Sequence, residues 1–243
     1  MNMLRRLING LVDIVYPKTC LACKNKLNGA SIEHIICAKC WNKIKRNVPP
    51  FCHFCGRHLG NRNLTKNICQ NCLKANLHFD RAFSPCVYEG VIKELIHQFK
   101  YKSKDYLGSP LSKLMIGFIK EYNIPMDYLD FILPIPLHKT RLREREFNQA
   151  QILSEYIAKE FKKNLLSDVL IRHRHTKTQI DLEINQRLLN VLESFSVTRQ
   201  SDIKGKNLLL VDDVLTTAAT SSEAARTLKD AGANIVFVLT LAN

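Results

Sequence analysis

The stretch Asn207–Ala225, which reads NLLLVDDVLTTAATSSEAA, decides the fold. Its apolar run, Leu208–Val211, has the length and the residue types of a buried strand. Two adjacent carboxylates, Asp212 and Asp213, end the run, and a loop of small hydroxyl and methyl residues, Thr216–Thr220, follows them. A buried strand that leads directly into a helix is the repeating unit of parallel α/β sheets, so this order predicts an α/β fold.

The helix after this loop offers a site for a phosphate group. We expect its N-terminal cap at Ser221 or Ser222, with Glu223 in the first turn. Backbone N–H groups at a helix N-terminus lack partners within the helix, and threonine hydroxyls beside them add further donors. The residues expected around the phosphate are Thr216, Thr217, Ala218, Ala219 and Thr220.

The paired acids indicate that the ligand also carries hydroxyl groups or a bound metal ion. Carboxylates repel phosphate, so Asp212 and Asp213 suit sugar hydroxyls or a hydrated magnesium ion instead. A phosphate acceptor one turn away from a diol acceptor predicts a cradle for ribose 5-phosphate. The alternative is a buried strand that enters a capped helix, with both acids engaged only in the turn.

Eight of the nine cysteines form a duplicated pattern. In each copy, thirteen residues separate two Cys-x2-Cys pairs, and the second copy lies 32 residues after the first. Metal geometry imposes such a spacing, and four thiolates enclose a tetrahedral zinc ion with no open position, so we predict two structural zinc ions. The expected ligands are Cys20, Cys23, Cys37, Cys40, Cys52, Cys55, Cys69 and Cys72.

Alternatives to this arrangement stay open. Disulfides are disfavoured because no secretory signal accompanies the cysteines, while iron–sulfur ligation and crossed pairing between the two copies are both compatible with the spacing. The segment is too short and polar to bury a sufficient core, so metal must supply its folding free energy, about 10–16 kcal/mol per ion. We expect His34, His53 and His58 at the surface, and the ninth cysteine, Cys86, buried as a small apolar residue.

The charge of the chain favours an anionic partner. The formal net charge is +14, or about +10 once eight thiolates and two zinc ions are counted, a balance typical of proteins that bind nucleic acid or other polyanions. The cysteine region is basic, with Glu33 as its single acid, and Trp41, Phe51 and Phe54 offer surfaces on which nucleobases could stack. A protein-docking module with these rings in a small core is an equal alternative.

Alternating helix and strand patterns follow the cysteine region. We expect helices over 91–102 and 109–122, a short strand over Phe131–Leu137 and a last buried strand over Ile235–Leu241. This alternation predicts a parallel sheet that is covered by helices on both faces.

Two cationic segments are expected to face a polyanionic ligand. The loop after the strand 131–137 carries His138, Lys139 and Arg141 at the edge where ligands bind in open α/β sheets; a solvated basic turn is the alternative. A later segment has weak apolar periodicity and is a candidate lid. Its polar residues are Arg172, Arg174, Lys177, Gln179 and Arg187.

The N-terminal 17 residues are expected to form an amphipathic helix that ends at Pro17. Polar residues interrupt its apolar run and no cleavage site follows, which argues against a signal peptide. No apolar stretch approaches the roughly 20 residues that span a bilayer, so we expect a cytoplasmic protein. We divide the chain into this helix (1–17), a double zinc ribbon (18–76) and the α/β domain (77–243).

The stretch 207–225 resembles the signature of type I phosphoribosyltransferases, in which an apolar strand, two acids and a threonine-rich loop hold phosphoribosyl pyrophosphate (PRPP). Three further segments, LPIPL (133–137), REFNQA (145–150) and TKTQ (176–179), accompany the duplicated cysteines. Together they resemble the ComF (competence protein F) family over nearly the whole chain. The resemblance implies a type I phosphoribosyltransferase-like parallel sheet flanked by helices, preceded by a small zinc-ribbon domain.

The same resemblance implies a function. It implies a protein that binds PRPP with magnesium, handles single-stranded DNA during natural transformation, and has a competence helicase and other uptake proteins as partners. It also gives Lys100 a place in the ligand site. The alternative is a metabolic phosphoribosyltransferase that joins ribose 5-phosphate to a nucleobase or amine, with Asp212 and Asp213 as catalytic residues. A third hypothesis is a structural adaptor.

Two residues depart from these family patterns. Type I phosphoribosyltransferases mostly have glycine where this chain has Ala218, and the ComF family usually has glycine where it has Glu146. A side chain at position 218 disfavours a positive φ, and Glu146 adds an acid near the proposed anion site. The departures leave the fold prediction intact, and whether the chain turns over PRPP stays open.

Overall fold

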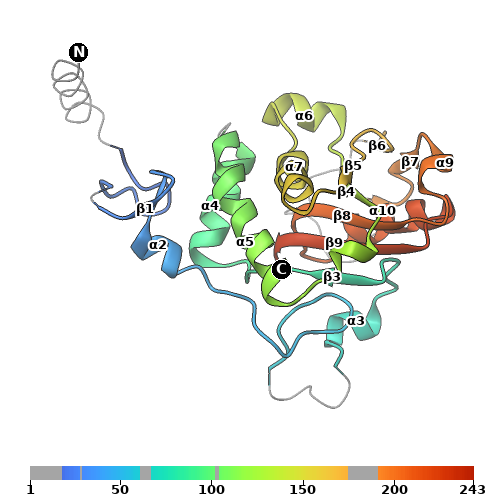
Figure 1. Cartoon of the computed structure of the whole chain (residues 1–243), viewed down its shortest axis with the longest axis horizontal. Helices are drawn as coiled ribbons and strands as arrows, with labels where there is room; N and C mark the ends of the chain where they lie inside the picture. Colours follow the sequence, from blue (N-terminus) through green and yellow to red (C-terminus); the bar gives the residue numbers. More distant parts are fainter. Residues whose placement is uncertain (1–17, 28, 61–66, 102–103, 175–190) are drawn as a thin grey trace.

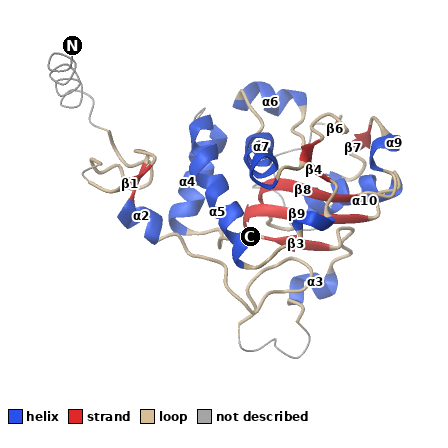
Figure 2. Ribbon diagram, viewed as in Figure 1, coloured by secondary structure: helices blue, strands red, loops and turns tan. Residues whose placement is uncertain are grey.

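A five-stranded, entirely parallel sheet forms the centre of the molecule, with the strand order β3-β9-β8-β4-β5 (Figures 1 and 2). The computed structural model describes residues 18–27, 29–60, 67–101, 104–174 and 191–243. The strands of this sheet are β3 (Arg81–Phe83), β4 (Phe131–Pro134), β5 (Asn164–Leu165), β8 (Asn207–Val214) and β9 (Ile235–Ala242).

Helices cover both faces of the sheet, as predicted. Alternate residues of β8 point to opposite faces: Leu209 and Val211 pack in one cluster with α4, α5 and α7, whereas Leu208 and Leu210 pack in a second cluster with α10. The helices are α2 (Ala38–Asn42), α3 (Gln70–Lys74), α4 (Gly90–Tyr101), α5 (Gly108–Glu121), α6 (Lys139–Arg145), α7 (Gln149–Phe161), α9 (Gln200–Ile203) and α10 (Ala219–Asp230), with 3-10 turns η2 (Asp105–Leu107) and η3 (Met126–Tyr128).

The basic segment after β4 is a helix, which corrects the expected loop. Strand β4 ends at Pro134, earlier than predicted, and α6 begins at Lys139. The side chain of His138 accepts a hydrogen bond from the backbone N–H of Thr140, which caps this helix. Local capping therefore organises the cationic segment.

The helix α10 begins three to four residues earlier than a cap at Ser221 or Ser222 predicts. Its N-cap is Ala218, and Ser221 and Ser222 lie buried in its first turn. The hydroxyl of Ser222 accepts a hydrogen bond from the backbone N–H of His78 (3.1 Å), so a tertiary contact uses the group that was expected to cap. Glu223 lies beyond the first turn and pairs with Arg226.

The ends of the candidate lid form a small antiparallel ribbon where a loop was predicted. Strand β6 (Leu170–Arg172) pairs with β7 (Phe195–Val197). Residues 175–190, including Lys177, Gln179 and Arg187, lie outside the described residues, as does the N-terminal helix expected over 1–17.

The first cysteine repeat packs against helices α4 and α5 (Figure 1). It contains the short hairpin of β1 (Ser31–Ile32) and β2 (Ile36–Cys37). The amide of Gln98 donates to the carbonyl oxygen of Leu21 (2.6 Å), and Glu33 accepts from Ser109 and pairs with Lys113. The first repeat thereby shares a core with the α/β domain.

The second cysteine repeat packs against edge strand β3. The backbone N–H of Ala82 donates to the carbonyl oxygen of Phe54 (2.6 Å), which attaches the repeat to the sheet edge. Gly56 allows this approach, because its φ is +68° and a Cβ there would lie 2.4 Å from the carbonyl oxygen of Ala82. Cys52, Cys55 and Leu59 join the core beneath the sheet.

Within the described residues, no helix combines the length and the apolar character that crossing a bilayer requires.

Candidate functional site

A cavity of about 410 Å³ opens where β8 and β4 end. This is the carboxyl edge of the sheet, where ligands bind in open parallel α/β folds. Its wall combines two carboxylates with several cations and aromatic rings. The lining residues that bear on chemistry are Tyr88, Lys93, His97, Lys100, Tyr101, Arg141, Arg145, Asn148, Gln149, Arg172, Asp212, Asp213, Thr216 and Thr220.

The two acids differ in their surroundings. Asp213 is buried, and its carboxylate lies 2.6 Å from the ammonium nitrogen of Lys100 at the end of α4. Asp212 accepts a hydrogen bond from the backbone N–H of Asp213 (2.8 Å). Asp213 therefore has a fixed cationic partner, and both acids line the cavity.

Burial changes the protonation of this group of charges. Burial, together with the charge of Asp213, raises the pKa of Asp212 to about 7, although the cation of Lys100 opposes the rise. Burial disfavours the ammonium form of Lys100, but the carboxylate of Asp213 outweighs burial and raises the pKa of Lys100. Lys100 is thus charged near neutral pH, and Asp212 titrates there.

The loop after β8 has the geometry of an anion cradle. It passes from Thr216 to Ala218, which adopts a left-handed backbone (φ +63°), and α10 starts at the next residue. The hydroxyl of Thr217 accepts from the N–H of Ala219 at 3.5 Å, and Thr216 and Thr220 line the cavity. A twelve-residue helix that begins at a cavity presents its N-terminal dipole and N–H groups to an anion.

The REFNQ segment positions a buried guanidinium at the same cavity. Arg145 is 8% exposed, lies 5.1 Å over the ring of Tyr101, and donates to the side-chain oxygen of Gln149 (3.2 Å). Gln149 in turn donates to the carbonyl oxygen of Phe99 (3.0 Å). Asn148 caps α7 and donates to the carbonyl oxygen of Ile135, which joins this segment to the end of β4.

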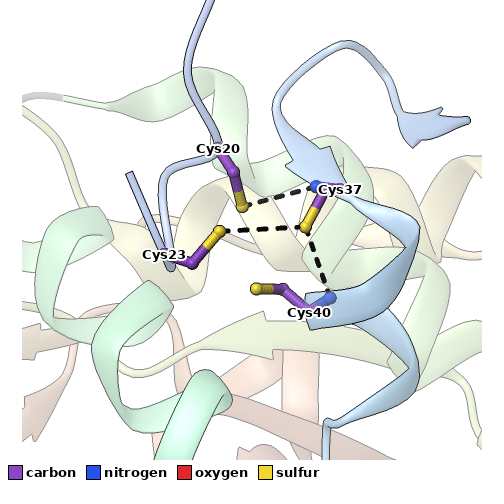
Figure 3. A group of neighbouring side chains, drawn as sticks. All are labelled: Cys20, Cys23, Cys37 and Cys40. Carbon is purple, nitrogen blue, oxygen red and sulfur yellow. Dashed lines mark hydrogen bonds between the residues drawn. The ribbon is translucent and has the colours of Figure 1, made fainter. Parts of the chain in front are cut away.

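Four sulfur atoms of the first cysteine repeat converge from two segments of the chain (Figure 3). All four lie within 4.8 Å of one another, and Cys23 Sγ and Cys37 Sγ are 3.9 Å apart. A tetrahedral zinc ion with Zn–S bonds near 2.3 Å requires sulfur separations of about 3.8 Å, so this donor set fits zinc. Burial opposes ionisation of Cys20, but N–H groups of Cys23, Cys37 and Ala22 outweigh it and lower the pKa of this thiol to about 6.

The second repeat forms an equivalent cluster of four sulfurs within the same limit, with Cys55 Sγ and Cys69 Sγ 3.6 Å apart. The backbone N–H of Cys69 donates to Cys52 Sγ (3.3 Å), as the N–H of Cys37 donates to Cys20 Sγ in the first repeat. Pairing is therefore within each repeat, and the crossed alternative is wrong. None of the nine cysteines, all in the described part of the chain, forms a disulfide.

The remaining cysteine and the ribbon histidines lie as expected. Cys86 is fully buried, and burial raises the pKa of its thiol to about 12. His34, His53 and His58 are exposed, and none belongs to either cysteine cluster of the described residues.

Comparison with known proteins finds the same two parts. A double zinc ribbon domain matches residues 11–73, and a phosphoribosyl transferase domain matches residues 149–243. Competence protein F of Haemophilus influenzae is 27% identical over 226 residues, which cover 92% of this chain and 96% of that protein. DNA utilization protein YhgH of Salmonella typhi is 28% identical (93% and 96% covered), and competence protein ComFC of Bacillus subtilis is 29% identical (81% and 79% covered).

Over most of its length the chain is similar to competence proteins F and ComFC, and it combines a double zinc ribbon with a phosphoribosyl transferase domain. Both departures from the expected family patterns occupy positions where the backbone has a positive φ. Ala218 has φ +63° and Glu146, at the C-cap of α6, has φ +67°. Glycine adopts this conformation without strain, which accounts for a glycine at each of these positions in the patterns. The side chain of Glu146 is exposed, and the described wall of the cavity does not include it.

The structure brings together most of the residues that the sequence indicated for the ligand site. Asp212, Asp213, Lys100 and Arg141 line one cavity, together with Thr216 and Thr220. The other indicated residues lie beside it or elsewhere. Thr217, Ala218 and Ala219 form the turn into α10, His138 caps α6, Lys139 is exposed in its first turn, and Arg187 lies outside the described residues.

Sequence reasoning missed the aromatic part of the cavity. Tyr88, His97 and Tyr101 line it, the last two from one face of α4, where the rings of His97 and Tyr101 lie 5.0 Å apart. The spacing of these two residues by four on a predicted helix was the available signal. The sequence indicated Arg172 only as part of a candidate lid, and the fold places it at the ligand cavity together with Arg145.

Proposed function

We propose that this protein binds PRPP and handles single-stranded DNA during DNA uptake. The observation that carries the first half is the carboxylate pair and the threonine loop at the end of β8, which share one cavity with Lys100 and three arginines. This combination fits a ribose that carries phosphate at one end and pyrophosphate at the other.

Different residues of the cavity would bind different parts of PRPP. The carboxylates of Asp212 and Asp213 would accept hydrogen bonds from the ribose hydroxyls, and the loop that leads into α10 would hold the 5-phosphate. The guanidinium groups of Arg141, Arg145 and Arg172 would hold the pyrophosphate, to which bidentate hydrogen bonding is suited. Magnesium, when bound with the pyrophosphate, would neutralise part of its charge.

The second half of the proposal rests on charge and on the relatives' names. Competence protein F and a DNA utilization protein match over more than nine-tenths of this chain. The first ribbon exposes cations that the phosphates of DNA could contact. Phe51, in contrast, packs against Phe118 and Tyr122 inside the protein, so its ring is not part of this exposed surface. The exposed cations are Lys18, Lys24, Lys26, Lys39, Lys43, Lys45 and Arg46. A location in the cytoplasm and contact with uptake proteins such as a competence helicase complete the proposal.

Ligand binding is tested by thermal unfolding with PRPP, with and without magnesium. We expect millimolar PRPP to raise the melting temperature of the wild type and to leave that of Asp212→Asn unchanged. Lys113→Met, which removes a cation from an exposed pair on α5, is the matched control and should respond like the wild type. No shift for the wild type with or without magnesium would refute PRPP binding.

DNA binding is tested on the full chain, since both ribbons share cores with the sheet and their removal would expose apolar surface. Replacing Lys39, Lys43 and Lys45 by glutamine should weaken binding of single-stranded DNA and reduce its salt dependence. Equal affinity of wild type and variant at every salt concentration would exclude the ribbon as the contact.

A metabolic phosphoribosyltransferase is the second candidate. Tyr88, His97 and Tyr101 give the cavity aromatic surfaces beside the acids, against which an acceptor base could stack. In that reaction the bond from ribose C1 to pyrophosphate breaks and a bond from C1 to nitrogen forms. Release of pyrophosphate from PRPP with any of the common nucleobases would favour this candidate over binding alone.

A further inference from the structure

A second cavity, of about 250 Å³, lies where three parts of the chain meet. The second ribbon supplies one side, the C-terminal end of α5 and the turn after it supply another, and strands β3 and β9 supply the third. The lining residues are Phe51, Gly56, Arg81, Phe83, Phe118, Tyr122, Asn123, Ile124, Pro125 and Phe237.

Two groups of aromatic rings contribute to the walls of this cavity. In one group, Phe51 meets Tyr122 edge to face at 5.1 Å between ring centroids and also contacts Phe118. In the other, Phe83 meets Phe237 edge to face at 5.6 Å. Rings from four separate segments provide flat apolar surfaces, which suit a planar ring.

Arg81 gives this aromatic cavity a hydrogen-bond donor. Its guanidinium carbon lies 5.1 Å over the ring of Phe83, and its Nε is buried with no hydrogen-bond partner among the described residues. Because Arg81 lines the cavity, its guanidinium group supplies N–H donors for an oxygen or nitrogen acceptor of a ligand.

The cavity is held open by contacts outside it. The N–H of Ala82 donates to the carbonyl oxygen of Phe54, and the amide of Asn47 donates to the carbonyl oxygens of Gly56 and Ser84 (2.8 and 2.9 Å). The neighbouring Cys52 and Cys55 belong to the second cysteine cluster. The walls are thus fixed before a ligand arrives, as is usual for small-molecule sites.

We propose that this second cavity binds a nucleobase. The aromatic walls suit a planar ring better than a metal ion, and the guanidinium group of Arg81 disfavours a purely hydrocarbon ligand. A nucleobase meets both demands, because it stacks on aromatic rings and carries carbonyl or ring-nitrogen acceptors.

The base can come from a single strand or from a free nucleoside. A single strand as the source rests on the DNA handling proposed above. Its backbone would remain on the surface of the basic ribbon while one base inserts between ribbon and sheet, which would explain why the two parts are packed together.

The test compares two oligonucleotides of about 15 nucleotides that differ only in their bases. One is oligothymidylate, and the other has the same backbone with abasic residues. We expect the wild type to bind oligothymidylate about tenfold more tightly in fluorescence anisotropy, the range that stacking of one or two bases gives. Arg81→Gln should lose most of this preference.

Arg57→Gln is the matched control, since it removes one positive charge from the same ribbon without altering the described lining of the cavity. This variant should bind both oligonucleotides more weakly by the same factor, and it should still prefer oligothymidylate to the abasic oligonucleotide. Tyr122→Leu, a wall variant on a separate element, should lose the preference as Arg81→Gln does. Two zinc ions per chain and an unchanged melting temperature verify that each variant is folded.

A second arm, titration with free thymidine observed by NMR, separates this site from the proposed DNA function. Tight binding of both oligonucleotides without preference, and no thymidine binding, would overturn the nucleobase site and leave DNA handling in place. Thymidine binding that Arg81→Gln abolishes, with neither oligonucleotide bound, would support the site and overturn its use for DNA. Failure of all three ligands to bind would overturn both.

Discussion

The ammonium nitrogen of Lys100 lies 2.6 Å from a carboxylate oxygen of Asp213, and the two side chains are only 18% and 9% exposed. Lys100 lies in the last turn of α4, and Asp213 lies near the end of β8, so one ion pair joins the helix layer to the centre of the sheet at the ligand cavity. Beside this pair, burial and the charge of Asp213 raise the pKa of Asp212 to about 7.

Lys100→Met should destabilise the protein by about 3–5 kcal/mol, because it leaves the charge of Asp213 buried without a partner. Urea unfolding at neutral pH measures the loss. Adding Asp213→Asn to the variant should recover part of it, since the unpaired charge disappears. Lys113→Met, which breaks an exposed pair with Glu33, should cost at most about 1 kcal/mol; an equal cost for both lysines would contradict the buried role of Lys100.

Asp212→Asn should stabilise the protein at alkaline pH. The folded-state pKa of Asp212 is about 7, well above the value near 3.9 of an unfolded chain, so the wild type loses stability as pH rises from about 4 to 7. The variant lacks this loss, and we expect it to be more stable by about 1–3 kcal/mol near pH 8 and no more stable near pH 4.

Asp213→Asn is the contrasting variant for this pH series. It breaks the pair with Lys100, so it should destabilise the protein at neutral and alkaline pH, the opposite sign to Asp212→Asn. Similar curves of unfolding free energy against pH for the two variants would show that the acids do not differ as described.

Ala218→Gly should stabilise the protein by about 1 kcal/mol, because glycine adopts the φ of +63° without strain. The control is Ala224→Gly inside α10, which should destabilise by about 1 kcal/mol. Chemical denaturation measures the change in unfolding free energy for each variant and shows whether the two changes have opposite signs. If strain also limits the phosphate loop, Ala218→Gly should enlarge the thermal shift that PRPP produces.

Cys40→Ser should reduce bound zinc from two ions to one and lower the stability of the whole chain. Cys40 and Cys20 share a core with α4 and α5, so loss of the first zinc ion disturbs the α/β domain as well as the ribbon. Cys86→Ser also replaces a buried sulfur, but it should retain two zinc ions. Metal analysis and thermal unfolding of the two variants decide this; a ribbon that unfolds separately from an intact sheet would be contrary evidence.

The sequence by itself determined features whose geometry is set over short distances along the chain. The Cys-x2-Cys pairs predict zinc ligands because two residues between thiolates already fix a metal knuckle. The run Leu208–Val211 with Asp212, Asp213 and the threonine loop predicts a strand that ends at a ligand site, because periodicity and strand ends are local properties.

Only the tertiary structure decided which distant groups meet. The pairing within each repeat, the ion pair of Lys100 with Asp213, and the stacking of Arg145 on Tyr101 all join segments whose approach no spacing encodes. They meet because burial of apolar side chains on both faces of β8 fixes where α4, α7 and the ribbons pack. The hydrophobic core sets these distances, and the polar contacts of the site follow from it.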